Sequence, residues 1–252
     1  MKVLRSFLIP KEFCRAVLAI GNFDGLHIGH KKVVETAKII SLKNKNKVGV
    51  MTFEPHPKSF FRKQFDFFRL TPFRMKYELL KELKIDFMLN LKFNENLMKI
   101  SSEDFIEKIL IKDLNVAHVV TGFDFVFGNN QTGDVNFLRE YCNSTKKFSF
   151  TEIDEQKMDG SEVSSSILRK YLRDGRIEHV NSILSRKWSI MSTVIDGEKK
   201  ARKIGFRTAN LKVNSYCDIR FGVYAVEVEL PVEMSKEKLY GIANYGVKPT
   251  FD

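Results

Sequence analysis

The chain has 252 residues, of which 42 are Lys or Arg and 31 are Asp or Glu, so its formal net charge at pH 7 is +11. With 43% hydrophobic and 29% charged residues it can bury a core, which excludes disordered, collagen-like and low-complexity proteins. Three scattered cysteines, Cys14, Cys142 and Cys217, indicate reduced thiols. Because no apolar run approaches a membrane span, and Arg5 and Pro10 interrupt the N-terminal one, we expect a soluble, cytoplasmic protein with no membrane partner.

The positive charge is spread along the chain. Two denser spots occur, at residues 43–47 and 199–203, and both are also typical of solvated turns. A nucleic-acid-binding protein would gather its basic residues on one patch, whereas enzymes that act on phosphorylated substrates are often basic throughout. We therefore expect small phosphorylated substrates and no nucleic acid.

In chain order, the first 153 residues alternate between strand and helix patterns. Apolar runs predict strands at residues 15–21, 48–53, 86–91, 117–122 and 148–153, and helical spacing predicts helices at 31–43, from 71 to about 84, and after 101. This alternation predicts an α/β fold with a parallel sheet that binds ligands beyond the carboxyl ends of its strands. After Leu184, the pieces 188–195, 221–230 and 239–245 predict a small antiparallel sheet or barrel. The predicted domains are 1–185 and 186–252.

The first chemical motif, GNFDGLHIGH at residues 21–30, directly follows the first predicted strand. Its glycines allow a tight turn against a ligand, and the next helix points its N-terminal N–H groups at the same place. His27 and His30 can donate hydrogen bonds to phosphate oxygens. A glycine-rich turn with two ordinary histidines is the plainer interpretation, and a metal pair is weaker still because no further His or Cys shares the segment.

Three later stretches carry related signals. Residues 163–169 read VSSSILR, so Ser165 and Arg169 share a helical face that could meet a polyphosphate, or could be a helix cap and a solvated arginine. The loop from Gly122 to Gly133 places three Phe side chains where they could stack on a flat ring, although core packing is the commoner fate. His56 lies in a stiff loop between two prolines.

In this order the motifs resemble the adenylyltransferase module of the prokaryotic bifunctional riboflavin kinase/FMN adenylyltransferases, from about Gly21 to the end of the chain. The resemblance implies a Rossmann-like nucleotidylyltransferase domain followed by a small β-barrel domain. It also implies transfer of AMP from ATP to the FMN phosphate, giving FAD and pyrophosphate, with Mg²⁺ as cofactor and riboflavin as a further substrate. The candidate catalytic residues are His27, His30, Ser165 and Arg169, and the candidate ATP- or flavin-binding residues are Gly21, Phe23, Asp24, Gly25, Gly29, His56, Pro57, Gly122, Asp124, Phe125, Gly128 and Ser164.

The second domain resembles the riboflavin kinase module, with departures. Residues 197–210 read GEKKARKIGFRTAN, so Ala201 stands where the family has Gly and Arg207 where it has Pro. The resemblance implies that Gly197, Gly205, Thr208 and Asn210 bind ATP, the last two also Mg²⁺. Asp252 comes before the glutamate that, by the resemblance, is the base for the riboflavin hydroxyl, and before the family's last strand and C-terminal helix, so we expect a truncated, incomplete barrel domain. We therefore expect FMN adenylylation with weak or lost riboflavin phosphorylation.

Three alternatives remain open. The first is a fully bifunctional enzyme. The second is a cytidylyl- or pantetheine-type transferase, which would have no reason to carry the 205–210 stretch. The third is a nucleic-acid- or flavin-binding protein without catalysis.

Overall fold

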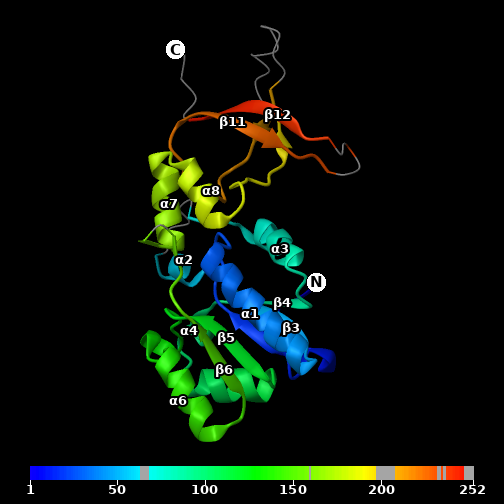
Figure 1. Ribbon diagram of the computed structural model, residues 1–252, viewed down its shortest axis with the longest axis vertical. Coiled ribbons are helices and arrows are strands. Elements are labelled where there is room, and N and C mark those ends of the chain that lie inside the picture. The colour runs from blue at the N-terminus through cyan, green and yellow to red at the C-terminus, as the bar shows by residue number, and fades with distance from the viewer. Residues whose placement is uncertain (63–67, 159, 197–207, 232–233, 235–236, 247–252) are drawn as a thin grey trace.

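The computed structural model describes residues 1–62, 68–158, 160–196, 208–231, 234 and 237–246 (Figure 1). The strands are β1 (Lys2–Leu4), β2 (Val17–Ile20), β3 (Val48–Glu54), β4 (Phe87–Lys92), β5 (His118–Gly122), β6 (Ser149–Ile153), β7 (Lys157–Met158), β8 (Ser161–Glu162), β9 (Val194–Ile195), β10 (Asn210–Leu211), β11 (Gly222–Val228) and β12 (Leu239–Tyr245). The helices are η1 (Lys11–Phe13), α1 (Ile28–Asn44), α2 (Pro57–Arg62), α3 (Phe73–Glu82), α4 (Glu95–Met98), α5 (Ser102–Asp104), η2 (Phe105–Asp113), η3 (Asn129–Gln131), α6 (Val135–Thr145), α7 (Ser165–Asp174) and α8 (Ile177–Leu184).

A six-stranded parallel sheet, in the order β1-β4-β3-β2-β5-β6, is the centre of the molecule. From β2 the chain goes to β3 and β4 on one side, then returns to β5 and β6 on the other. Such a reversal opens a crevice at the carboxyl ends of the two strands that flank it, where ligands bind in open parallel sheets. Because the GNFDGLHIGH motif follows β2, the topology brings it to this crevice.

Alternating residues of each strand divide the core into two layers. Leu18 and Ile20 of β2 pack into a cluster with η2 and α6, on one face of the sheet. Val17 and Ala19 pack into a second cluster, with α1 and α3. Both faces are thus covered by helices, which is the arrangement that continuous apolar strands require.

A third, smaller cluster joins α7 and α8 to segments from both halves of the sequence. Leu168 and Leu172 of α7, Val180 of α8 and Leu70 are fully buried there, and Cys217 is buried beside them. In Figure 1 these two helices lie between the large sheet and the β11–β12 pair. The cluster therefore fixes α7 against the segment that precedes α3.

The predicted α/β class and the five parallel strands are confirmed, each within about two residues of its expected bounds. The short edge strand β1 was not predicted. The predicted strand at 188–195 is wrong over most of its length, because only Val194 and Ile195 pair, with β10. β11 and β12 form an antiparallel pair as expected. In the part of the chain that the structure describes, no helix is long and apolar enough to cross a membrane.

Candidate active site

The GNFDGLHIGH motif forms a strained loop between β2 and α1. Phe23, Gly25 and Leu26 have positive φ angles of 50°, 89° and 43°. Only glycine adopts such angles freely, and a Cβ at Gly25 would also lie 2.8 Å from the Leu70 side chain. Phe23 and Leu26 are each 1% exposed, so burial of their side chains holds the loop in this conformation.

His27 caps the N-terminus of α1. Its Nδ1 accepts a hydrogen bond from the backbone N–H of His30 at 3.4 Å, in the place that Ser or Asp usually fills. The neutral ring then carries its proton on Nε2, which remains a donor. The two histidine rings stack, with centroids 3.7 Å apart, and a Cβ at Gly29 would lie 3.2 Å from His27 Nδ1. The motif therefore places two imidazoles at the positive end of a helix dipole.

Burial keeps both histidines neutral. It lowers the pKa of His27 to about 4, although Asp24 opposes the effect. Burial also lowers the pKa of His30 well below its ordinary value, helped by His27, Lys76 and Arg169. At neutral pH the rings can thus donate hydrogen bonds to a phosphate without carrying charge themselves.

We expect the ring protons of His27 to show no titration between about pH 5.5 and 8. Its pKa in the folded protein is about 4, below the ordinary 6.5, so the stabilisation from the neutral ring is complete above pH 6.5 and is lost as the pH falls toward 4. Histidine-selective NMR would follow the resonance, assigned by its loss in His27→Gln. A midpoint near pH 6.5 would contradict the buried, neutral ring.

Asp24 is the centre of the polar network below the loop. It is 2% exposed, and its carboxylate accepts hydrogen bonds from the backbone N–H groups of Leu70 and Thr71 at 3.2 and 2.9 Å and from the Thr71 hydroxyl at 3.2 Å. It also forms an ion pair with Arg169. Burial alone would raise the pKa of Asp24, but the attraction of Arg169 and Lys76 and the two backbone donors lower it. Asp24 is therefore ionised and fully engaged.

The residues of α7 reach this network from the far end of the domain. Ser164 caps the helix by accepting from the Ile167 N–H, and the Ser165 hydroxyl donates to the Asp24 carbonyl at 2.8 Å. Arg169 donates from Nε to the Phe68 carbonyl at 2.7 Å, and its guanidinium lies 3.9 Å from the centre of the Phe68 ring. The predicted shared face of Ser165 and Arg169 thus meets Asp24, with Ser164 as the cap.

A buried lysine that the sequence analysis missed completes the network. Lys76 of α3 is 3% exposed and donates to the Asn22 carbonyl at 2.7 Å and to the Thr52 hydroxyl at 3.4 Å. Burial lowers its pKa to about 8, against the attraction of Asp24. The signal was present in the sequence, because Lys76 shares the helical spacing of Leu79 and Leu80, which are core residues.

His56 and Pro57 lie beyond the end of β3. His56 Nδ1 accepts from the Lys58 N–H at 3.1 Å, and burial lowers the pKa of the ring to about 3. Pro57 is the first residue of α2. Near them, Arg69 pairs with Glu54 through two hydrogen bonds. The histidine is thus a buried, neutral group next to the network.

The loop after β5 begins at the same edge of the sheet as the motif. Gly122 closes β5 and Asp124 is exposed. Phe125 stacks on the buried Phe127 at 5.5 Å, so these two rings belong to the core, whereas Phe123 is 42% exposed. Gly128 has a φ of 76°, and a Cβ there would lie 2.8 Å from the Ser102 backbone nitrogen. Phe123 is the ring of this loop that presents most surface.

Of the four candidates in the second domain, Thr208 and Asn210 lie within the described residues, and Gly197 and Gly205 lie outside them. Thr208 is exposed, and Asn210 is partly exposed in β10, opposite Ile195. Both side chains offer oxygen atoms, which Mg²⁺ prefers.

The described residues contain no group of three or more His, Cys, Asp or Glu side chains that could hold a metal ion. At the crevice, the carboxylate of Asp24 already accepts from Leu70, Thr71 and Arg169. The Asp24 carboxylate is therefore not free to bind Mg²⁺, and we derive no step through the ion there.

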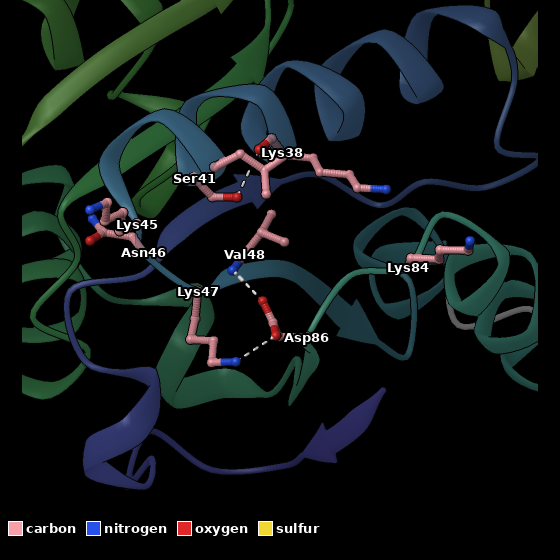
Figure 2. A pocket seen from close by; sticks show the side chains of 9 residues that line it. Lys38, Ser41, Lys45, Asn46, Lys47, Val48, Lys84 and Asp86 are labelled. Atoms are coloured by element: carbon pink, nitrogen blue, oxygen red, sulfur yellow. Dashed lines mark hydrogen bonds and ion pairs between the residues drawn. The ribbon is translucent and has the colours of Figure 1, made fainter.

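A hollow of about 340 Å³ lies at the other edge of the sheet, where β3 begins (Figure 2). Its lining includes Lys38, Lys47, Lys84 and Asp86. Asp86 accepts from the Val48 N–H at 2.8 Å and from Lys47 Nζ at 3.0 Å, which connects β3 to the loop before β4. The hollow is at the amino end of the strands, away from the histidines. The Asp86 carboxylate in its lining holds two segments of the sheet together.

Comparisons with known proteins cover nearly the whole chain. Residues 9–167 match the family model described as FAD synthetase, and residues 184–252 match the one described as Riboflavin kinase. Proteins described as bifunctional riboflavin kinase/FMN adenylyltransferase are 34% identical in Buchnera aphidicola subsp. Schizaphis graminum, over all of this chain and 80% of that protein, and 36% identical in Bacillus subtilis, over 97% and 76%. The chain belongs to the bifunctional riboflavin kinase/FMN adenylyltransferase family.

The relative in Escherichia coli K12 is 34% identical over 99% of this chain and 79% of that protein. A solved structure from Streptococcus pneumoniae, described as a macrolide-efflux protein, superposes with a TM-score of 0.84 over 99% of this chain and 80% of that one. At 24% identity it supports the fold alone. This family membership confirms that the protein is an enzyme, and both of the family's modules are represented in the chain.

Proposed function

We propose that the crevice at the carboxyl ends of β2 and β5 transfers AMP from ATP to FMN, giving FAD and pyrophosphate. The observation that carries the proposal is the joint placement of His27 and His30 at the N-terminus of α1, beside the ion pair of Asp24 and Arg169. The match to the FAD synthetase model supports the same reaction. We also propose that 1–185 is this catalytic domain and that the protein acts in the cytoplasm.

The chemistry needs little from the protein beyond position and charge. The FMN phosphate is already an anion, so its oxygen attacks the α-phosphorus of ATP without a general base, and the bond to pyrophosphate breaks as the new P–O bond forms. Catalysis then requires the two phosphates in line and stabilisation of the negative charge that develops on the leaving group. Neutral imidazole donors and a helix N-terminus supply this without titrating.

In this proposal the histidines hold the phosphates of ATP. His27 donates from Nε2, because its Nδ1 is occupied by the His30 N–H. Ser165 and Arg169 of α7 donate to Asp24 and so support the loop that carries the histidines, and Lys76 adds a buried positive charge beneath the motif. Mg²⁺, when bound, would neutralise phosphate charge, and the oxygens of Thr208 and Asn210 would hold it in the second domain.

The match of residues 184–252 to the Riboflavin kinase model favours a second activity, phosphorylation of riboflavin to FMN. The expected loss of this activity receives no support, because the comparisons find both modules, and we do not propose it. The same match disfavours a cytidylyl- or pantetheine-type transferase, which has no use for such a module.

One assay tests the proposal. The purified chain is incubated with ATP and Mg²⁺ together with FMN or riboflavin, and the flavins are separated by chromatography, with CTP replacing ATP as the control. We expect FAD and pyrophosphate from FMN plus ATP and none from CTP. A folded protein that makes no FAD would overturn the adenylyltransferase proposal. Formation of FMN from riboflavin would establish the second activity.

A further inference from the structure

The segment that leaves α8, residues 184–188, is tied by hydrogen bonds to the GNFDGLHIGH motif and to the first turn of α1. We call it the linker. Arg186 of the linker donates from Nη2 to the Gly25 carbonyl at 2.8 Å. In return, Lys31 of α1 donates from Nζ to the Leu184 carbonyl at 2.9 Å and to the Ser185 hydroxyl at 2.5 Å. The partners are more than 150 positions apart in sequence, so the contact is tertiary.

The atom that Arg186 holds lies at the most constrained point of the loop. Gly25 has a φ of 89°, its N–H donates to the Thr71 hydroxyl at 2.8 Å, and its carbonyl accepts from Arg186. Both polar groups of this buried glycine are therefore satisfied by distant residues. Two residues later His27 is the N-cap of α1, so the Gly25 peptide lies directly before the start of the helix.

A second linker residue, Trp188, contacts Leu70, whose N–H group binds the Asp24 carboxylate. The Trp188 indole donates from Nε1 to the Leu70 carbonyl at 3.3 Å, while the Leu70 N–H donates to Asp24 at 3.2 Å. The Trp188 N–H is fixed by the Asn181 side chain at 2.7 Å. The linker thus contacts both the loop that carries the histidines and the segment that holds the Asp24 carboxylate.

We propose that Arg186 is a positioning residue for adenylyl transfer, which fixes the Gly25 carbonyl and so aims the N-terminus of α1 at the phosphates. The inference rests on the proposed function and extends it, since it makes the start of the second module part of the first module's catalytic apparatus. Arg186 acts through Gly25 and His27 and does not itself contact the reacting atoms.

The test compares Arg186→Gln and Arg186→Lys with Lys187→Gln. Lys187→Gln is the matched control, because it removes a cation one residue away from Arg186. The Lys187 ammonium pairs with Glu227 on β11 and not with the motif. We expect Arg186→Gln to lower kcat for FAD formation by about ten- to a hundredfold, with the KM for ATP within about threefold of wild type. Arg186→Lys should recover part of the loss, and Lys187→Gln should resemble wild type.

The readouts separate positioning from folding. Rates are expressed per ATP-binding site, counted by equilibrium titration with a non-hydrolysable ATP analogue, and the melting temperature is followed by circular dichroism. If Arg186→Gln lowers only the melting temperature or the number of binding sites, with kcat per site unchanged, the positioning role is wrong. If the wild-type chain binds ATP and makes no FAD, the proposed function fails instead, and the two failures are distinct.

Discussion

Replacing Arg169 by methionine should lower the free energy of unfolding by about 3–5 kcal/mol, because the change leaves the buried carboxylate of Asp24 without its cation. Asp24 is 2% exposed and Arg169 is 7% exposed, so water cannot replace the lost partner. Methionine preserves much of the side-chain volume, which limits any cavity contribution. Urea unfolding at pH 7 measures the effect. The matched control is Lys170→Met, because Lys170 is the exposed neighbour on the same helix.

The pH dependence of this difference is a second check on its cause. The pKa of Asp24 in the folded protein lies below its ordinary 3.8, so the stabilisation from the ionised form is present above pH 3.8 and is lost as the pH falls further. In Arg169→Met the carboxyl group takes up its proton at higher pH than in the wild type, since the nearest cation that offsets its burial is gone. The two unfolding curves should therefore converge toward low pH. A difference below 1 kcal/mol at pH 7 would show that the pair contributes little.

His30→Ala should reduce kcat for FAD formation by about 10²–10³-fold, as expected for loss of one donor to a developing negative charge. His30 stacks on His27 and meets the edge of Phe23, but it is partly exposed, so we expect the fold to survive. Steady-state kinetics with chromatographic detection of FAD measures the loss, and circular dichroism checks folding. His179→Ala, at an exposed histidine of α8, is the control. Turnover near the wild-type rate in His30→Ala would remove His30 from the mechanism.

The sheet could be predicted because its strands are short, apolar and regularly spaced between helices. Val17–Ile20 is buried on both faces, so its sequence carries a continuous apolar signal. The strand expected at 188–195 fails for the opposite reason. Trp188 is apolar but is used in tertiary packing and hydrogen bonding to Leu70 and Asn181, and local patterns cannot separate such contacts from a strand.

The candidate site was predicted in part. The spacing of the motifs predicted His27, His30, Ser165 and Arg169 as candidates. In the structure the two histidines stack, and Ser165 and Arg169 both bind Asp24 of the same motif. The sequence could not show that Asp24 is their common partner, because the ion pair depends on how α7 packs. Arg186 was missed because its guanidinium reaches a backbone carbonyl, which no sequence pattern marks, whereas Lys76 carried a signal in its helical spacing with Leu79 and Leu80.

The ion pair between Asp24 and Arg169 spans 145 positions of the sequence, and the bond from Ser165 to Asp24 spans 141. During synthesis, the strands β2 to β5 and the motif leave the ribosome well before α7 does. Until α7 is made, Asp24 lacks its ion-pair partner Arg169, so we expect the packing around the motif to be completed late. Contacts of such long range slow folding. We therefore expect that this crevice closes among the last steps of folding, and that a nascent chain shorter than about 170 residues exposes it to chaperones and proteases.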